Sequence, residues 1–261
     1  MTQGILLTRE GDIATVALSN PGKLNALTLG MWDELATTMR ALSTDETLRC
    51  VVIRGAGEEA FAAGADIAEF ATVRNTEEQA KAYHRRHVYG ALRAIGDCRH
   101  PTVAMIKGAC AGGGLEIACL CDLRISGKSG RFGVPINRLG FPIAYEELAA
   151  LLPLAGKAVM LEILLEGRML GADEAYAKGL LTRVVEDAQA EDEAYATARR
   201  IAAGAPLVAR WNKARINRLL ALPEALTEAE NDTGFAHMQT EDYSIGMKAF
   251  LAKTKPKFVG R

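Results

Sequence analysis

Several features that define common classes of protein are missing from this sequence. Its 261 residues contain no stretch approaching the roughly 18 uninterrupted apolar residues of a membrane span. The 31 basic and 32 acidic residues leave a net charge of −1, which gives no electrostatic reason to expect nucleic acid as the main partner. With 49% hydrophobic residues, the chain has the composition of a globular protein that can bury a large core.

Cysteine is scarce and lacks metal-binding spacing. The five cysteines are odd in number and mostly lie in apolar runs, which is typical of small core residues in a reducing compartment. Cys119 and Cys121 are separated by one residue, but no second Cys or His pair stands at a zinc-like distance. The N-terminal MTQGILLTREGD has neither the cationic start nor the long apolar core of a signal peptide. We predict a cytoplasmic protein without a metal site.

Strand and helix patterns alternate up to about residue 190. Short β-branched runs bounded by turns predict strands, and apolar residues at helical spacing predict two long helices between them. The strands are expected at 5–10, 12–19, 49–55, 102–108 and 121–126, and the helices at 28–45 and 76–98. Strands interleaved with helices indicate βαβ units with buried, mostly parallel strands.

The last quarter of the chain reads as helical. Four amphipathic segments are expected, at 192–206, 207–222, 224–239 and 241–253. They carry more apolar residues than an isolated appendage should expose, which favours self-association. We therefore divide the chain into a core, residues 1–190, and a helical oligomerisation region, residues 191–261.

One segment combines consecutive glycines with a single carboxylate. In KGACAGGGLEIACLCDLRIS, residues 107–126, Gly112 to Gly114 precede Glu116. The spacing matches neither nucleotide-binding pattern, G-x-x-x-x-G-K-[ST] or G-x-G-x-x-G. Glycines at a strand-to-helix junction leave backbone N–H groups uncovered, where they can bind a negatively charged oxygen. The alternative is that these glycines only permit tight packing.

A second corner of small residues follows another predicted strand. Ala63, Gly64 and Ala65 stand just before an acidic helical turn, and two such corners could converge on one carbonyl oxygen as an oxyanion hole. Glu116 lies three residues after Gly113, so the first helical turn should carry it close to that carbonyl. Its apolar neighbours should raise its pKa toward a range useful for proton transfer. A carboxylate that merely stabilises a helix N-terminus would have the same spacing.

Five blocks of the sequence, in order, resemble the enoyl-CoA hydratase/isomerase (crotonase) superfamily. They are NPGKLNAL, AFAAGADIAEF, IKGACAGGGLEIACLCDLRIS, GRFGVP and SIGMKAFLAKTKPKF. The resemblance spans essentially the whole chain and implies an α/β fold, a crotonase-like spiral of ββα units with a C-terminal helical trimerisation region. It implies a homotrimer or hexamer that acts on an acyl-CoA thioester. Coenzyme A would enter as part of the substrate, with no separate cofactor and no nucleic acid or membrane partner.

The resemblance also implies roles for individual residues. The backbone N–H groups of Ala65 and Gly113 would stabilise an enolate anion, and Glu116 matches a catalytic glutamate of the hydratases. Lys23 lies in the block that borders the coenzyme A nucleotide in the family. The implied substrate-binding residues are Lys23, Leu24, Ala26, Ala63, Asp66, Ile67, Gly112, Pro135, Ile136 and Ile143.

One catalytic position departs from the hydratase pattern. Typical hydratases carry a second glutamate directly after the proline of the FG.P block, where this chain has Ile136. Glu146 and Glu147 are replacement candidates, but both fall in the first turn of a predicted helix, where dipole stabilisation and solvent exposure are expected. Tyr145 and Asn137 could position a water or a substrate carbonyl.

Other polar residues are assigned to structure rather than to chemistry. We expect Asp66 to cap a turn or helix, and His84 and His87 in the run HRRH to lie on a solvated or inter-subunit face. Trp32 and Trp211 are expected to pack in helices or at an interface.

The sequence therefore predicts an acyl-CoA hydratase or dehydratase that uses Glu116 alone. An isomerase, racemase, lyase or decarboxylase acting through the same enolate is one alternative. A non-catalytic acyl-CoA-binding member of the superfamily is the other.

Overall fold

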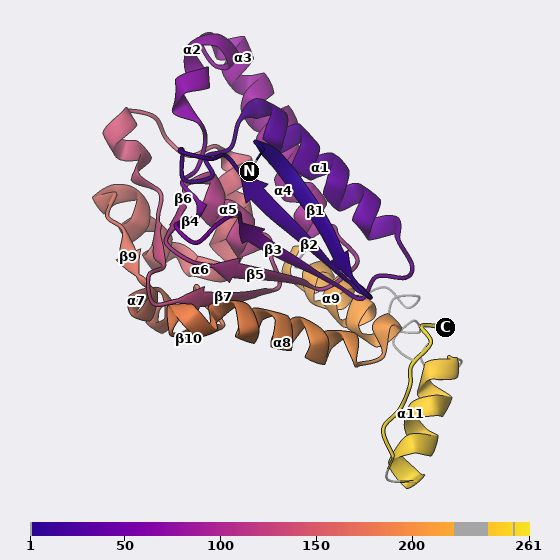
Figure 1. Cartoon of the computed structure of the whole chain (residues 1–261). Helices are drawn as coiled ribbons and strands as arrows, with labels where there is room; N and C mark the ends of the chain where they lie inside the picture. The colour runs from indigo at the N-terminus through magenta and orange to yellow at the C-terminus, as the bar shows by residue number, and fades with distance from the viewer. Residues whose placement is uncertain (1, 222–239, 253) are drawn as a thin grey trace.

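The computed structural model describes residues 2–221, 240–252 and 254–261, and within them two β-sheets form the centre of the fold (Figure 1). The larger sheet has the order β1-β2-β3-β5-β7-β10, and the smaller has the order β4-β6-β8-β9. The larger sheet comprises β1 (Gly4–Glu10), β2 (Ile13–Ser19), β3 (Cys50–Gly55), β5 (Thr102–Ile106), β7 (Leu123–Gly127) and β10 (Arg183–Val185). The smaller comprises β4 (Ala60–Ala62), β6 (Ala109–Ala111), β8 (Arg131–Gly133) and β9 (Leu170–Gly171).

The five predicted strands all form, and their pairing is mostly parallel as expected. β1 and β2 make an antiparallel hairpin whose turn uses Gly11 at a φ of 60°. From β2 through β3, β5 and β7 to β10 every pairing is parallel. The residues of β5 are buried throughout, which is typical of a central parallel strand covered on both faces.

Successive turns of the chain repeat one unit. A strand of the larger sheet is followed by a short strand of the smaller sheet and then by a helix, as in β3-β4-α4 and β5-β6-α5. This is the predicted spiral of ββα units. Each turn of the spiral brings the end of a short strand and the start of a helix to the same side of the molecule.

Helices cover both faces of the larger sheet. On one face α1 (Leu29–Thr44) buries Trp32 and Leu35 beside α4 (Tyr89–Gly96). The Thr28 side chain caps α1 by accepting a hydrogen bond from the N–H of Met31. On the other face α8 (Ala190–Ala202) lies along the sheet (Figure 1). α8 presents an alanine at every fourth position, which lets the helix approach the strands closely: Ala190, Ala194, Ala198 and Ala202.

The helix predicted at 76–98 is not one regular helix. It divides into α3 (Glu77–Ala82), a π-helical turn η2 (Tyr83–Val88) and α4. Thr76 begins α3 with a capping box that includes Gln79. Two short elements precede it, η1 (Ile67–Glu69) and α2 (Phe70–Val73). A π-helical turn shifts the helical register, and such turns occur frequently at functional sites.

The remaining elements follow β6. They are α5 (Gly113–Leu120), η3 (Pro135–Leu139), α6 (Tyr145–Glu166), α7 (Ala172–Ala177), η4 (Asp187–Gln189), α9 (Pro206–Ala221) and α11 (Glu241–Ala252). Of the described helices, α6 alone has a length and composition that a membrane crossing would need. It is interrupted at Gly156 (φ 72°, ψ 164°) and buries Glu147, Leu151 and Ile163 against the core.

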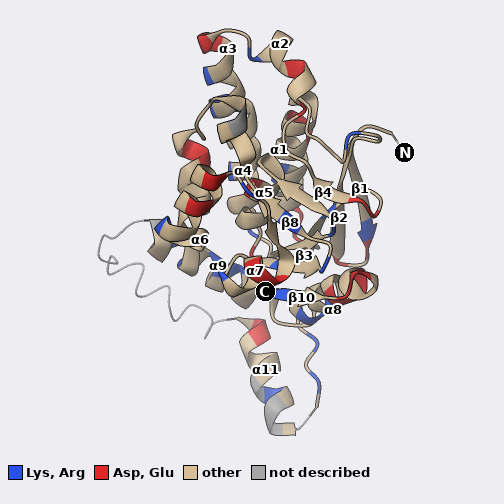
Figure 2. Ribbon diagram, turned by 90° about the vertical axis from the view of Figure 1, so that its left-hand side faces the viewer, with Lys and Arg blue, Asp and Glu red and all other residues tan. Residues whose placement is uncertain are grey.

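The C-terminal region is helical where it is described. The predicted helix at 224–239 lies outside the described residues, and α8, α9 and α11 match the other three segments. α8 follows the boundary at residue 190 and yet packs on the core sheet, so the division at that residue stays a prediction. α11 lies outside the body of the sheets in both views, and acidic and basic residues are interspersed over the ribbon (Figures 1 and 2).

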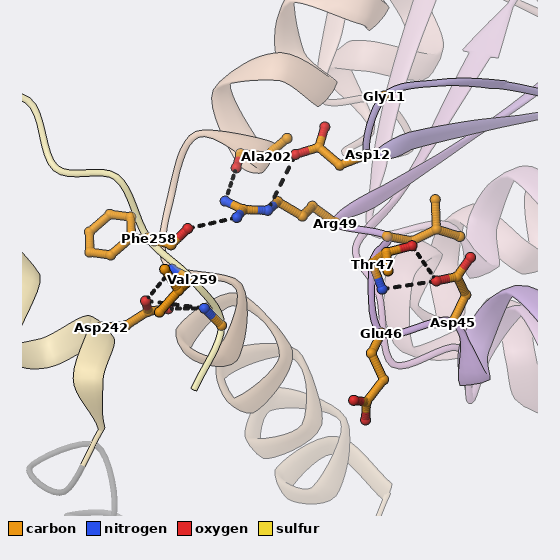
Figure 3. A network of polar contacts seen from close by, with 12 residues as sticks. Gly11, Asp12, Asp45, Glu46, Thr47, Arg49, Ala202, Asp242, Phe258 and Val259 are labelled. Carbon is orange, nitrogen blue, oxygen red and sulfur yellow. Dashed lines mark hydrogen bonds and ion pairs between the residues drawn. The ribbon is translucent and has the colours of Figure 1, made fainter.

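The C-terminal tail is held by two charged side chains, one next to β3 and one in α11 (Figure 3). Arg49, at the start of β3, donates to the carbonyl oxygens of Ala202 (3.0 Å) and Phe258 (2.7 Å). Asp242, only 2% exposed, accepts hydrogen bonds from the N–H groups of Val259 (2.6 Å) and Gly260 (3.1 Å). The tail is thereby fixed to the start of α11.

We predict that Asp242→Ala lowers the free energy of unfolding by about 1–3 kcal/mol, because two tail N–H groups lose a charged acceptor. Glu241→Ala is the matched control, since Glu241 is exposed and pairs only with Arg261 among the described residues. Urea unfolding at one fixed protein concentration measures both variants. Equal midpoints for the two would contradict this account of the tail.

Candidate active site

A pocket lies where the spiral brings together the ends of β4 and β6, the N-terminus of α5, the π-helical turn and the start of α6. Nine of the residues predicted for the site line it: Ala63, Ala65, Ile67, Gly112, Gly113, Glu116, Pro135, Ile136 and Ile143. These residues come from three separate segments of the sequence, so the fold assembles them.

The two small-residue corners meet, as predicted. A β-carbon placed on Gly64 would lie 3.0 Å from the carbonyl oxygen of Ala111 and 3.6 Å from the nitrogen of Gly113. Gly64 has a φ of +101° and Gly112 of +47°, values that glycine adopts without strain. The segments 63–65 and 111–113 therefore lie in direct contact, and left-handed glycines make the contact possible.

Each corner leaves at least one backbone donor without an acceptor in the described residues. The N–H of Asp66 donates to Leu27 and the N–H of Gly112 to Gly133, but within the described residues the N–H groups of Ala65 and Gly113 donate to no acceptor. Gly113 is the first residue of α5, where N–H groups have no partner inside the helix. The site thus offers two adjacent donors for an anionic oxygen.

The glycine run serves both purposes considered from the sequence, tight packing and the uncovering of backbone N–H groups. A β-carbon on Gly113 would lie 2.7 Å from Cζ2 of Trp32, and one on Gly114 would lie 2.3 Å from the carbonyl oxygen of Ala62. Glycine is required for packing at both positions, and the same packing brings the start of α5 against β4. The same glycines therefore provide both the tight packing and the uncovered N–H groups.

Glu116 is buried in the first turn of α5 and faces the pocket. Its side chain accepts no hydrogen bond from the described residues, and only 5% of the residue is exposed. Burial first, and then the charge of Glu147, raise the pKa of Glu116 well above its ordinary value of 4.5. The carboxyl group therefore keeps its proton at higher pH than an exposed glutamate would, and it faces the pocket as a potential proton donor.

Glu147 was expected at an exposed helix start, and this expectation is wrong. The residue is only 5% exposed and lines the pocket. Its Oε1 lies 2.5 Å from Nδ1 of His84. Glu146, by contrast, is not part of the pocket and lies 3.3 Å from Arg85. The chain therefore places a second buried carboxylate near Glu116 although Ile136 occupies the family's usual position.

The expectation for His84 is also wrong. The π-helical turn directs the adjacent residues Tyr83 and His84 into the pocket together with Val88. The surface role expected for the HRRH run suits His87, whose Nδ1 lies 2.6 Å from Asp33 at an exposed site. The charged run HRRH predicted a surface position for both histidines, and no periodicity in the sequence marks the π-helical turn that brings His84 to the pocket.

The remaining candidates lie away from the pocket lining. Tyr145 is 88% exposed, and the Asn137 amide donates to the carbonyl oxygen of Leu165. The cysteines Cys119 and Cys121 are buried and unbridged, and burial raises the pKa of each thiol to about 12. At neutral pH these thiols are protonated and are poor nucleophiles.

The chain as a whole has relatives among known proteins. Residues 8–261 match the family Enoyl-CoA hydratase/isomerase. The chain belongs to this family.

Individual relatives resemble it along nearly their full length. A short-chain-enoyl-CoA hydratase of Clostridium acetobutylicum is 31% identical over 96% of this chain and 95% of its own. A crotonyl-CoA hydratase of Syntrophomonas wolfei is 28% identical, with 99% of both chains covered. The crystal structure of an enoyl-CoA hydratase/carnithine racemase from Magnetospirillum magneticum is 51% identical, with a TM-score of 0.97 over 100% of this chain and 97% of that one. These matches confirm the predicted superfamily and fold.

Four of the residues implied by the family resemblance flank the pocket without lining it. Lys23 Nζ lies 2.6 Å from Asp66 Oδ2, and Asp66 caps η1 as predicted. The carbonyl oxygen of Leu24 accepts from the N–H of Ala63 (3.0 Å), and Ala26 is buried. The segment 23–27 therefore supports the first corner from outside.

Further residues of the lining were not predicted from the sequence. Phe70, Tyr83 and Phe141 form an aromatic group, with ring centroids 5.5 Å apart for Phe70 and Tyr83 and 6.3 Å apart for Phe70 and Phe141. The lining also includes Gly64 of the predicted first corner and Glu147, which was expected at an exposed helix start; the other additional residues are Trp32, Phe70, Tyr83, His84, Val88, Ala111, Val134, Leu139 and Phe141.

We predict that Glu116→Gln becomes more stable relative to the wild type as the pH rises. The folded wild type holds the Glu116 proton above the ordinary pKa of 4.5, whereas the unfolded chain releases it. Raising the pH therefore destabilises the wild type by at most about 1.4 kcal/mol per pH unit, and the glutamine variant escapes this loss. Urea unfolding between about pH 5 and about pH 8 measures the difference. With Glu146→Gln as control, a stability difference that did not grow with pH would contradict the burial of an ionisable Glu116.

Proposed function

We propose that this protein is an enoyl-CoA hydratase that binds the thioester carbonyl oxygen between the N–H groups of Ala65 and Gly113 and uses Glu116 for proton transfer. One observation carries the proposal: two backbone donors without a partner in the described residues meet beside a buried carboxyl group. Several relatives named as hydratases over their full length support the same reaction.

The proposed chemistry is addition of water to the double bond beside the thioester. The water oxygen bonds to the β-carbon and the water loses a proton. The electron pair of the double bond moves onto the α-carbon and thioester carbonyl, which gives an enolate. A proton then bonds to the α-carbon and the carbonyl re-forms. Two donors aimed at the enolate oxygen stabilise this state, and losing one such donor elsewhere costs roughly 3–4 kcal/mol.

Apolar side chains line the space in which the acyl group would lie. Ile67, Ile136 and Ile143 contribute aliphatic surface, and Phe70 and Phe141 contribute rings. In such surroundings the electrostatic attraction between N–H groups and a developing oxyanion is stronger than in water. The replacement of the family's glutamate by Ile136 thus adds apolar surface to the acyl site.

Coenzyme A would approach along the segment that contains Lys23 and Leu24. The Lys23 side chain is 50% exposed and pairs with Asp66, and Leu24 is 46% exposed. A cation beside exposed apolar surface suits an anionic nucleotide with an aromatic base. The coenzyme enters as part of the substrate, and the proposed reaction requires no other cofactor.

We also propose that the enzyme acts as a trimer or hexamer in the cytoplasm. Large apolar residues of α9 are exposed in the single chain, as an interface would require: Val208, Ile216, Leu219 and Leu220. Five free, buried thiols are compatible with a reducing compartment.

An isomerase that moves the double bond through the same enolate is the alternative. It needs a proton removed from one carbon and returned to another but no added water. Incubation with a β,γ-unsaturated acyl-CoA in place of crotonyl-CoA separates the two activities, since only an isomerase converts that substrate to the α,β-unsaturated thioester.

We predict that Glu116→Gln lowers the turnover of crotonyl-CoA by a factor on the order of 100 or more. Acetoacetyl-CoA should still bind with nearly unchanged affinity, because the oxyanion donors belong to the backbone. Loss of enoyl thioester absorbance measures turnover, and calorimetry measures binding. Glu146→Gln, outside the pocket, should keep most activity. A Glu116→Gln variant with wild-type turnover would remove the proton-transfer role.

A further inference from the structure

A second buried carboxylate, that of Glu147, shares the pocket with Glu116. It is the end of a chain of contacts that begins at Arg74 and passes through His84. Glu147 comes from the first turn of α6 and His84 from the π-helical turn η2. Arg74 directly follows α2. Arg74 lies 10 positions before His84, and Glu147 lies 63 positions after it. The fold places their side chains end to end: Arg74 contacts His84, and His84 contacts Glu147.

The contact with Arg74 determines where the imidazole carries its proton. Arg74 Nε donates to His84 Nε2 at 2.9 Å. An arginine N–H can only donate, so Nε2 must present its lone pair. The ring proton therefore sits on Nδ1, which lies 2.5 Å from Glu147 Oε1, and the imidazole donates to the carboxylate.

The chain is anchored at its far end by aromatic rings. The guanidinium of Arg74 lies over Phe70 and Phe141, with its carbon 4.8 Å and 4.2 Å from the two ring centroids. The π-helical turn is anchored as well, since the indole N–H of Trp32 donates to the hydroxyl of Tyr83 (3.2 Å). Arg74 and His84 are thus both held by contacts that do not involve the carboxylate.

We propose that Glu147 is the second proton-transfer group of this enzyme, taking over the task of the glutamate that Ile136 replaces, and that Arg74 and His84 are positioning residues that aim it. This inference rests on the proposed hydratase function. It differs from the family pattern in the origin of the second carboxylate, which comes from α6 instead of the segment after Pro135.

With two carboxyl groups, each proton that moves during hydration has a donor and an acceptor. Ionised Glu147 takes the proton that the water loses as its oxygen bonds to the β-carbon. Protonated Glu116 gives its proton to the α-carbon as the enolate collapses. The negative charge of Glu147 helps to keep Glu116 protonated before the reaction. After addition, the proton on Glu147 is released to solvent and Glu116 regains one, which restores the starting state.

Kinetics of four variants test the assignment of Glu147 and His84. Glu147→Gln should lower kcat for crotonyl-CoA by a factor on the order of 100, with KM and acetoacetyl-CoA affinity unchanged. His84→Ala should lower kcat by a factor of about 10, whereas His84→Asn should recover most of it, because the asparagine amide can donate from the place of Nδ1. The double variant Glu147→Gln/His84→Ala should be no slower than Glu147→Gln, since His84 acts only through Glu147.

A matched control is available one turn along the same helix. His87 pairs with Asp33 through the same ring nitrogen, at 2.6 Å, but at an exposed site outside the pocket. His87→Ala should therefore keep the wild-type kcat. Retained acetoacetyl-CoA binding shows that each variant is folded, and Glu147→Asp, which withdraws the carboxylate by one methylene, should also lower kcat.

The outcomes separate this inference from the proposed function. If Glu116→Gln is inactive while Glu147→Gln keeps kcat within about threefold of wild type, the hydratase proposal stands and the role of Glu147 is overturned. Losses that multiply in the double variant overturn the positioning role of His84. If both glutamine variants keep full activity, the proposed function itself fails.

The tautomer can be observed directly in the wild-type protein. Nitrogen NMR of histidine-labelled protein, with the His84 signal assigned by its absence from His84→Asn, should show a neutral ring protonated on Nδ1. In Arg74→Met the constraint on Nε2 is removed, and the proton should distribute between the two nitrogens. A wild-type ring protonated on Nε2 would overturn the chain of contacts on which the proposal depends.

Discussion

The candidate site depends on two backbone N–H groups, those of Ala65 and Gly113, that donate to no acceptor within the described residues. An N–H group that is shielded from water without an acceptor costs about 1–3 kcal/mol, and within the described residues Gly113 is buried and Ala65 half-buried. The surrounding structure offsets this cost. The contact of Gly64 with Ala111 and the packing of Gly113 against Trp32 hold both corners in place, so that the donors cannot turn toward other acceptors. The binding of an anionic oxygen then satisfies both groups at once.

The corners could be predicted from the sequence because their signals are local. A strand that ends in small residues before a helix exposes N–H groups whatever the rest of the fold does, and Ala65, Gly113 and Glu116 all follow such junctions. The local signals at His84 and Glu147, a charged run and a helix start, pointed to the surface. The two residues are 63 positions apart, and only the folded chain, with its π-helical turn, brings both of them to the pocket. Glu147 lies in the first turn of α6, where the sequence alone predicts a carboxylate that only stabilises the helix N-terminus.

Ile136 shows how one fold can keep a task while moving the residue that performs it. The main chain after Pro135 still forms a short turn beside the pocket, but it supplies apolar surface in place of a carboxylate. Glu147 reaches the same pocket from α6, and burial beside Glu116 places the two carboxyl groups under mutual repulsion. When two carboxyl groups lie close together away from water, the state with one shared proton is favoured over the state in which both are ionised. The singly protonated state supplies an acid and a base together.

The polarisation of the thioester carbonyl tests the central claim most directly. The vibrational frequency of an isotope-labelled carbonyl in crotonyl-CoA can be measured free in water and bound to Glu116→Gln, which holds the substrate without rapid turnover. If the N–H groups of Ala65 and Gly113 both donate to this oxygen, the bound carbonyl stretch should move to a clearly lower frequency than in water. A frequency equal to or above that in water would contradict the oxyanion hole and the account built on it.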